Sequence, residues 1–85
     1  MNDPCTLTIL LFGSLADAVG ARRLELSLPM PARASDALDA LASEHGPIRA
    51  ARPSLALAIN HAYAQPSQLL SPGDTIALIP PVSGG

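Results

Sequence analysis

The chain has 85 residues, enough for one small domain, and its five basic and seven acidic residues give a formal charge of −2. Apolar residues make up 48% of the chain and aromatic residues only 2%, so the core must be built from aliphatic side chains. All five basic residues are Arg and form no run, which argues against nucleic-acid binding, since that needs a clustered basic face and stacking aromatic residues.

The first part of the chain predicts a hairpin. Residues 6–12 are β-branched and aliphatic and stop at Gly13, which predicts a strand. Its second half loses the polar alternation, which predicts a central strand covered on both faces. Residues 14–19 have apolar positions at helical spacing before Gly20, which predicts a short helix. Residues 23–28 alternate apolar and polar, which predicts a half-buried strand that returns antiparallel to the first.

The principal helix is predicted over residues 35–45, where apolar side chains recur at helical spacing. Ser35 is the expected N-cap of this helix. His45 is expected at its C-terminal end, ahead of a Gly-Pro pair that stops the helix. Residues 48–53 are then expected to form a connector, with room for one loose helical turn.

Three further runs of small or β-branched apolar residues are bounded by turn signals. They predict strands over residues 55–59, 62–64 and 75–79. Asn60 and His61 form the expected turn between the first two, because Asn tolerates left-handed backbone angles better than most residues. Residues 71–74 carry Ser-Pro-Gly-Asp, a strong turn signal ahead of the last strand.

These elements predict an α+β fold of the β-grasp type, in which a mixed sheet of four to five strands packs on one main helix. The first and last strands are expected to be central and parallel to each other, because both are among the most continuously apolar segments. We predict one domain over residues 1–79, followed by a flexible tail over residues 80–85 that ends in Gly-Gly.

The tail has unusual chemistry for a chain end. Pro80 and Pro81 cannot donate to a sheet, so the last strand must end and the chain must leave stiffly. Gly84 and Gly85 lack side chains and can enter a narrow tunnel. Six residues reach roughly 20 Å, enough to place the carboxylate of Gly85 in a deep pocket of another protein. A carboxylate is a poor electrophile, so any transfer from it needs prior activation.

Over residues 7–85 the chain resembles the ubiquitin-like sulfur-carrier family, and within it the small subunits of molybdopterin synthase. The residues that carry the resemblance are Leu10-Leu11-Phe12, Ala58-Ile59-Asn60, Pro72-Gly73-Asp74 and the stretch from Ile79 to Gly85. Its Pro-Pro-Val-x-Gly-Gly is typical of the molybdopterin branch, whereas thiamine-pathway carriers usually lack the Pro pair. The chain departs from some relatives at Leu78 and Ile79, where aromatic residues are often found.

The resemblance implies that an activating enzyme uses ATP to adenylate Gly85 and that a sulfur donor converts it to a thiocarboxylate. The loaded tail would enter the large subunit of a heterotetrameric molybdopterin synthase and donate sulfur to a cyclic pyranopterin phosphate, forming the dithiolene. The implied insertion segment is Pro80, Pro81, Val82, Ser83, Gly84 and Gly85. The chain would bind no cofactor or metal and would not be catalytic alone.

Other functions remain open at this point. The chain could carry sulfur for another pathway, such as thiamine synthesis or tRNA thiolation. It could be a ubiquitin-like covalent modifier, whose Gly85 ends in an amide to a target lysine. It could also be a plain interaction domain with an incidental Gly-Gly end. A free-standing enzyme is disfavoured, because the sequence shows no nucleophile–base pair and no metal-ligand set.

The remaining candidate residues predict little chemistry. A single cysteine, Cys5, excludes a disulfide framework, and His45 and His61 are not at metal-ligand spacing. Residues 1–4 lack the basic start of a secretory signal, and the longest apolar run is too short to span a bilayer, so a cytoplasmic protein without a membrane partner is expected.

Composition also predicts a partner surface. With 48% apolar and only 14% charged residues, some apolar surface is expected to stay exposed, which often marks an interface. Phe12, one of two aromatic residues, ends the first predicted strand. If its ring is buried in the core, replacing it by Ala would cost roughly 3–5 kcal/mol.

Overall fold

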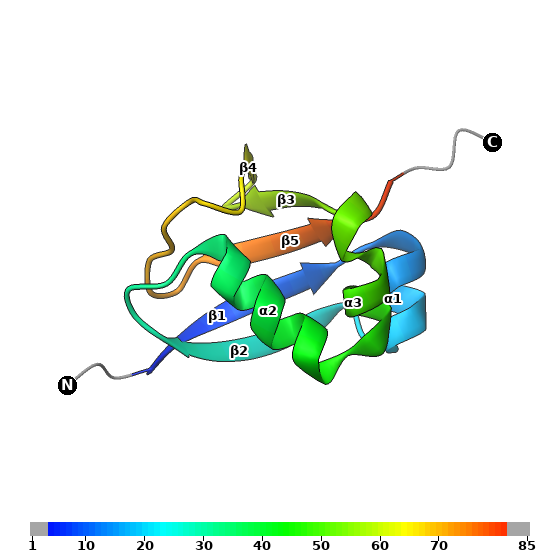
Figure 1. Ribbon diagram of the computed structural model, residues 1–85, viewed down its shortest axis with the longest axis horizontal. Coiled ribbons are helices and arrows are strands. Elements are labelled where there is room, and N and C mark those ends of the chain that lie inside the picture. The colour runs from blue at the N-terminus through cyan, green and yellow to red at the C-terminus, as the bar shows by residue number, and fades with distance from the viewer. Residues whose placement is uncertain (1–3, 82–85) are drawn as a thin grey trace.

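A computed structural model describes residues 4–81, in which a five-stranded sheet carries two helices, α2 and α3, on one face (Figure 1). The elements are β1 (Pro4–Leu11), α1 (Gly13–Val19), β2 (Arg23–Pro29), α2 (Ala34–Glu44), α3 (Gly46–Ala51), the 3-10 helix η1 (Arg52–Ser54), β3 (Ala56–Ile59), β4 (Ala62–Ala64) and β5 (Thr75–Ile79). Every predicted strand and both predicted helices are present, with ends within two residues of those expected.

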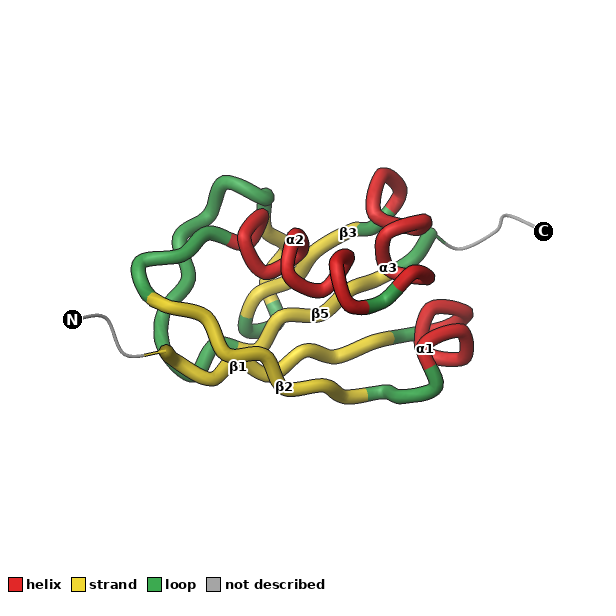
Figure 2. Tube along the Cα trace, turned by 60° about the horizontal axis from the view of Figure 1, so that its bottom comes forward, coloured by secondary structure: helices red, strands yellow, loops and turns green. Residues whose placement is uncertain are grey.

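The strand order is β2-β1-β5-β3-β4. β1 and β5 run parallel in the sheet, with Leu11 opposite Leu78, and the other neighbouring pairs are antiparallel. This confirms the β-grasp prediction, including the parallel pairing of the first and last strands. β1 and β5 therefore finish at the same end of the sheet, called here the tail end, which α1 and α3 flank (Figure 2). The end where these two strands begin, marked by Pro4, is called the opposite end.

The core lies between one face of the sheet and the helices α2 and α3. Leu7, Ile9 and Leu11 alternate along β1 and are buried in one cluster with Leu41 of α2 and Ile48 of α3. Alternate residues of a strand share a face, and the i, i+3, i+4 spacing of α2 supplies the matching apolar stripe. Burying each such side chain stabilises the fold by about 1.5–3 kcal/mol.

The second face of the sheet has no helix over it within residues 4–81, so the prediction that β1 is covered on both faces is wrong. Leu10 is half-buried by its neighbours in the flanking strands. Phe12 follows β1 in an extended conformation and is 46% exposed, so the condition for a large loss of stability in Phe12→Ala, a buried ring, is not met. Successive side chains of an extended chain point to opposite faces, and burial of Leu11 therefore turns Phe12 outward.

The start of α2 also differs from the prediction. The helix begins at Ala34 with Arg33 at the N-cap position, and not at Ser35. The Asp36 carboxylate accepts a hydrogen bond of 2.7 Å from the backbone N–H of Arg33. An acidic residue at the third helical position satisfies this donor from inside the helix and suits the positive end of the dipole. This arrangement replaces the expected serine cap.

The connector expected over residues 48–53 is in fact helical. His45 forms the C-cap of α2, as predicted, and its N–H donates to the carbonyl oxygen of Leu41 at 2.8 Å. The Gly46-Pro47 pair then opens α3 instead of only stopping α2. Proline suits the first turn of a helix because its missing N–H would have no partner there. Ile48 on α3 is thereby brought into the core.

The turn after β3 is fixed by a distant carboxylate. Asn60 and His61 take positive φ angles of 51° and 72°, as predicted for a tight hairpin. Asp74, only 9% exposed, accepts 2.9 Å and 2.7 Å bonds from Asn60 Nδ2 and from the Ser71 N–H. The Asn60 side-chain oxygen accepts a 3.0 Å bond from the Thr75 N–H. Asp74 thus joins its own turn to the β3–β4 turn, a long-range role that the sequence did not reveal.

Candidate functional site at the root of the tail

The sheet ends where Ile79 of β5 faces Ala56 of β3. Pro80, half-buried, and Pro81, exposed, come next and have no N–H with which to extend the ladder. The predicted insertion segment therefore starts from the end of a central strand, as expected. Its remaining residues, Val82, Ser83, Gly84 and Gly85, lie outside the described residues.

Gly13 packs against the tail root, which consists of Ile79 and Pro80. A Cβ atom at Gly13 would lie 3.5 Å from Cγ of Pro80, and Gly13 has a φ of +55°. Residues other than glycine rarely adopt this backbone angle. The first residue of α1 thus lets the chain turn sharply at the end of β1, where an added side chain would contact the first proline of the tail.

An apolar surface adjoins the tail root. It is called here the open face and is formed by Leu10, Phe12, Ala58, Tyr63, Ala77 and Ile79. These residues, with His61 and Thr75, line a shallow groove of about 290 Å³. Phe12 is 46% exposed and Tyr63 is 82% exposed. Contiguous exposed apolar side chains of this kind mark protein interfaces, which agrees with the exposed patch expected from composition.

A larger hollow, of about 430 Å³, lies where α2 and η1 meet β3 and β4. Leu38, Leu55 and Pro66 are among its lining residues, and none of the lining residues belongs to β5 or the tail. Because the expected chemistry belongs to the tail, the open face is the better candidate for the functional surface.

The other candidate residues lie apart from one another. Cys5 opens β1 at the opposite end, facing Leu28 of β2. His61 occupies the β3–β4 turn, and His45 joins α2 to α3. Within residues 4–81, no three His, Cys, Asp or Glu side chains gather as a metal site. In the same residues, no helix is long and apolar enough to span a bilayer.

A protein-family model described as the ThiS family matches residues 9–85. The chain belongs to the ThiS family. The human molybdopterin synthase sulfur carrier subunit is 30% identical to this ThiS-family chain over 84 residues, covering 95% of this chain and 96% of the human one. SAMP1 from Haloferax volcanii is 30% identical with a TM-score of 0.84, covering 94% and 99%.

A structure of the complex between subunits 1 and 2 of the molybdopterin-converting factor from Helicobacter pylori contains a further similar chain. It is 23% identical with a TM-score of 0.64, covering 94% of this chain and 99% of that one, and it supports the fold alone. The ThiS-family match spans both the sheet and the tail, since it runs through Gly85. The resemblance drawn from the sequence motifs is therefore confirmed at the level of the family.

Sequence reasoning predicted an exposed apolar surface in this ThiS-family chain but could not say where it lies. The signal available in the sequence was the alternation of side chains between the two faces of the first strand. Leu11 and Leu7 share one face, so Leu10 must lie on the other. Locating Tyr63 and Ala77 on that same face required the registers of three strand pairs, which the sequence alone did not supply.

Proposed function

We propose that this ThiS-family chain is the sulfur carrier of molybdenum cofactor synthesis and that the Gly85 carboxylate is the group loaded with sulfur. The observation that carries the proposal is the position of the tail. Pro80 and Pro81 lead out of the strand β5, beside the open face and ahead of Gly84-Gly85. The 30% identity to the human molybdopterin synthase sulfur carrier subunit, over nearly all of both chains, supports the choice of pathway.

In the proposed reaction, a carboxylate oxygen of Gly85 attacks the α-phosphorus of ATP in an activating enzyme, and pyrophosphate leaves. The acyl adenylate so formed is electrophilic, whereas the free carboxylate repels nucleophiles. The terminal sulfur of a persulfide donor then attacks the carbonyl carbon, and AMP leaves. A thiol attacks the donor's other sulfur, forms a disulfide with the donor, and so releases a thiocarboxylate at Gly85. Like a thiolate, this group is nucleophilic at neutral pH. ATP is thus a substrate of the activating enzyme and not a cofactor of this chain.

The proposed acceptor is a cyclic pyranopterin phosphate held in the large subunit of molybdopterin synthase. Each loaded chain transfers one sulfur atom to this substrate, and hydrolysis of the acyl–sulfur bond restores the Gly85 carboxylate. Two loaded chains are therefore needed to build the two sulfurs of the dithiolene. The carrier supplies the reacting atom and the reach of the tail, and the large subunit supplies acid and base groups. The chain is accordingly proposed to be one subunit of a sulfurtransferase complex and not an enzyme by itself.

The large subunit is also the proposed occupant of the open face. About 20 Å of tail follows Ile79, so a pocket that holds Gly85 must lie close to the tail root. The rim of that pocket must then cover the surface beside the root, where Leu10, Phe12 and Ile79 are partly exposed. Covering these side chains removes apolar area from water and stabilises the complex.

The proposal predicts that sulfur is loaded at Gly85. After incubation with the activating enzyme, ATP and a sulfur donor, intact mass should rise by the difference between one sulfur and one oxygen atom, and fragmentation should place the change at Gly85. A matched control carries one additional Ala after Gly85, which displaces the carboxylate and should not load. No gain in mass, with the enzyme active on a known carrier, contradicts the proposal.

A second experiment distinguishes a sulfur carrier of molybdenum cofactor synthesis from a covalent protein modifier and from a carrier of another pathway. Likeness to SAMP1, a small archaeal modifier protein by name, favours covalent protein modification as the second candidate. The loaded chain should form molybdopterin when mixed with the large subunit and the pterin precursor. Conjugates of higher mass in host extracts, without sulfur transfer to the pterin, would favour the modifier. Sulfur transfer to a thiamine precursor or to tRNA would place the carrier in another pathway.

A further inference from the structure

The basic residues of this chain are all Arg, and most of them flank the tail. Four of the five lie toward the tail end: Arg22, Arg23, Arg49 and Arg52. The fifth, Arg33, precedes α2 on the other side of the fold, where it forms an isolated bridge with Leu69. The tail therefore leaves through a surface whose cations are guanidinium groups only.

Strand register places Arg22 within reach of the tail. The Leu11 N–H donates a 2.9 Å hydrogen bond to the carbonyl oxygen of Arg22, and Leu11 faces Leu78 in β5. Two strand spacings of about 4.8 Å put the Arg22 backbone about 10 Å from β5. The tail reaches roughly 20 Å, so its last residue can meet the exposed Arg22 side chain.

Arg52 lies on the other side of β5. Its carbonyl oxygen accepts a 3.2 Å hydrogen bond from the N–H of Leu55, and the next residue, Ala56, faces Ile79 at the tail root. One strand spacing and a short turn thus separate Arg52 from the point where the tail begins. The tail root has an arginine on each side.

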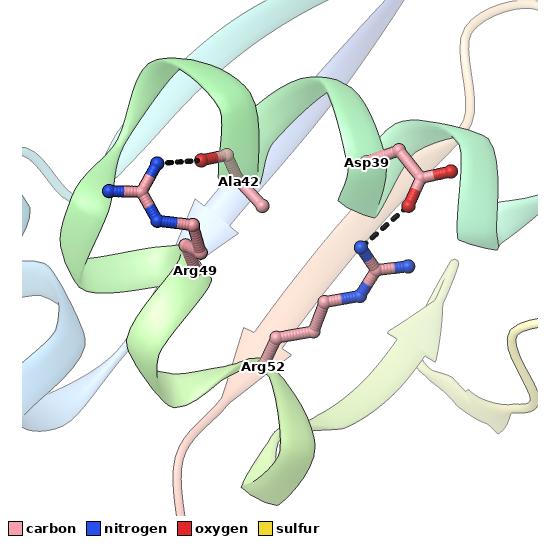
Figure 3. Close-up of polar contacts among 4 residues, drawn as sticks. All are labelled: Asp39, Ala42, Arg49 and Arg52. Carbon is pink, nitrogen blue, oxygen red and sulfur yellow. Dashed lines mark hydrogen bonds and ion pairs between the residues drawn. The ribbon is translucent and has the colours of Figure 1, made fainter.

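Figure 3 shows how the helical arginines are held. Nη1 of Arg52 lies 2.6 Å from Oδ1 of Asp39 on α2, and Nη1 of Arg49 donates to the carbonyl oxygen of Ala42 at 3.5 Å. A guanidinium keeps its proton in proteins, so it has no free electron pair to attack an acyl group. A lysine ammonium differs because it deprotonates readily to a nucleophilic amine.

The stronger nucleophiles of the chain are far from the tail root. Cys5 faces Leu28 of β2 at the opposite end. Six residue steps along β1 separate Cys5 from Leu11 at the tail end, a distance of about 20 Å. His45 is half-buried between α2 and α3, and an acyl-imidazole there would hydrolyse back to the carboxylate.

We infer that the arginine-only surface around the tail root is a selectivity feature: it keeps the activated carboxyl of Gly85 from being captured by the chain's own side chains. The inference rests on the proposed function. In the reaction avoided, a lysine amine attacks the carbonyl carbon of adenylated Gly85, a C–N bond forms, the C–O bond to AMP breaks, and the amine proton goes to solvent. That product has no free carboxyl and cannot carry sulfur, so the activated group remains for the external sulfur donor.

The full chain carrying a C-terminal thioester at Gly85 tests this without the activating enzyme. An amine displaces the thiol and forms an amide, which weighs one water less than the hydrolysed chain. Arg22→Lys and Arg52→Lys place an amine near the tail root, and Arg33→Lys is the matched control with the same change of chemistry at the opposite end. We expect both tail-end variants to form amide about tenfold faster than the control, because effective concentration is high only when a linker spans the gap. The wild type should only hydrolyse.

Three results would overturn the inference: amide formation by the folded wild type, equal rates in all three variants, or hydrolysis alone in both tail-end variants. The Arg33→Lys reaction is repeated in urea, where unfolding removes the distance between the new amine and the thioester. Amide formation under these conditions shows that this amine can react with the thioester. A failed sulfur-loading assay together with the expected thioester result would contradict the proposed function. It would still show that the arginine residues around the tail root do not capture an activated Gly85.

Discussion

Neighbouring residues at the end of β1 lie on opposite faces of the sheet. Leu11 is buried and Phe12 is exposed, because an extended backbone sends successive side chains to opposite faces. One position serves the core and the next serves the open face. The same division separates Leu78, which is buried, from Ile79, which lies on the open face.

Phe12→Ala should therefore weaken recognition more than stability. We expect it to lower the free energy of unfolding by less than about 1 kcal/mol, as is usual for surface sites. Binding to the large subunit should lose about 1–2 kcal/mol, since exposed aromatic side chains are common anchors of interfaces. Urea titration and calorimetric titration with the large subunit measure the two quantities.

Leu11→Ala is the matched control for this prediction. It should lower the free energy of unfolding by about 2–5 kcal/mol, because it leaves a cavity in the core. An equally large loss of stability in Phe12→Ala would show that the ring belongs to the core. An unchanged dissociation constant in Phe12→Ala would show that the partner does not cover the open face.

Among the elements, the two turns joined by Asp74 depend on one side chain. Asp74→Ala removes the acceptor of the Asn60 side chain and of the Ser71 N–H, and we expect a loss of about 1–3 kcal/mol in the free energy of unfolding. Asp39→Ala removes an ion pair whose carboxylate is largely exposed, which should cost about 0–1 kcal/mol. Equal urea midpoints for the two variants would contradict the proposed role of Asp74.

The strands were predictable because their signals are local. Alternation over β2 and the turn residues before β4 and β5 depend only on neighbours in the sequence, and the structure confirms all three. α3 was missed because Gly46-Pro47 fits both a helix stop and a helix start, and packing of Ile48 in the core decides between them. The cap of α2 was misplaced for a similar reason, since Ser35 and Asp36 both suit a helix start and Asp36 bonds back to Arg33.

The position of the open face could not be predicted from neighbouring residues in the sequence. A continuous apolar run such as that of β1 fits a strand covered on both faces, and it equally fits a strand with one face left for another protein. The sequence of a single chain does not distinguish these two cases, because the cover that we propose belongs to another protein. For the tail, the sequence itself carried the prediction through Pro80, Pro81 and the Gly-Gly end, and the family match supports it.

For the whole molecule, folding and sulfur loading should be separable. We predict that deletion of Gly85 changes the free energy of unfolding by less than about 1 kcal/mol, because the last member of the buried cluster within residues 4–81 is Leu78. The same deletion should abolish loading with sulfur. Thermal unfolding and the intact-mass assay measure the two effects, and a large drop in melting temperature would show that the tail contributes to the folded domain.

The parallel pairing of β1 and β5 also determines how the domain bears a mechanical load. A partner that grips the tail pulls on the end of β5 that is farthest from the start of β1. If the domain is anchored at its N-terminal side, the force runs along both strands and loads their hydrogen bonds together in shear, instead of opening them one at a time. The tail that we propose to enter another protein is thus attached to a strand whose pairing with β1 resists such a pull in shear.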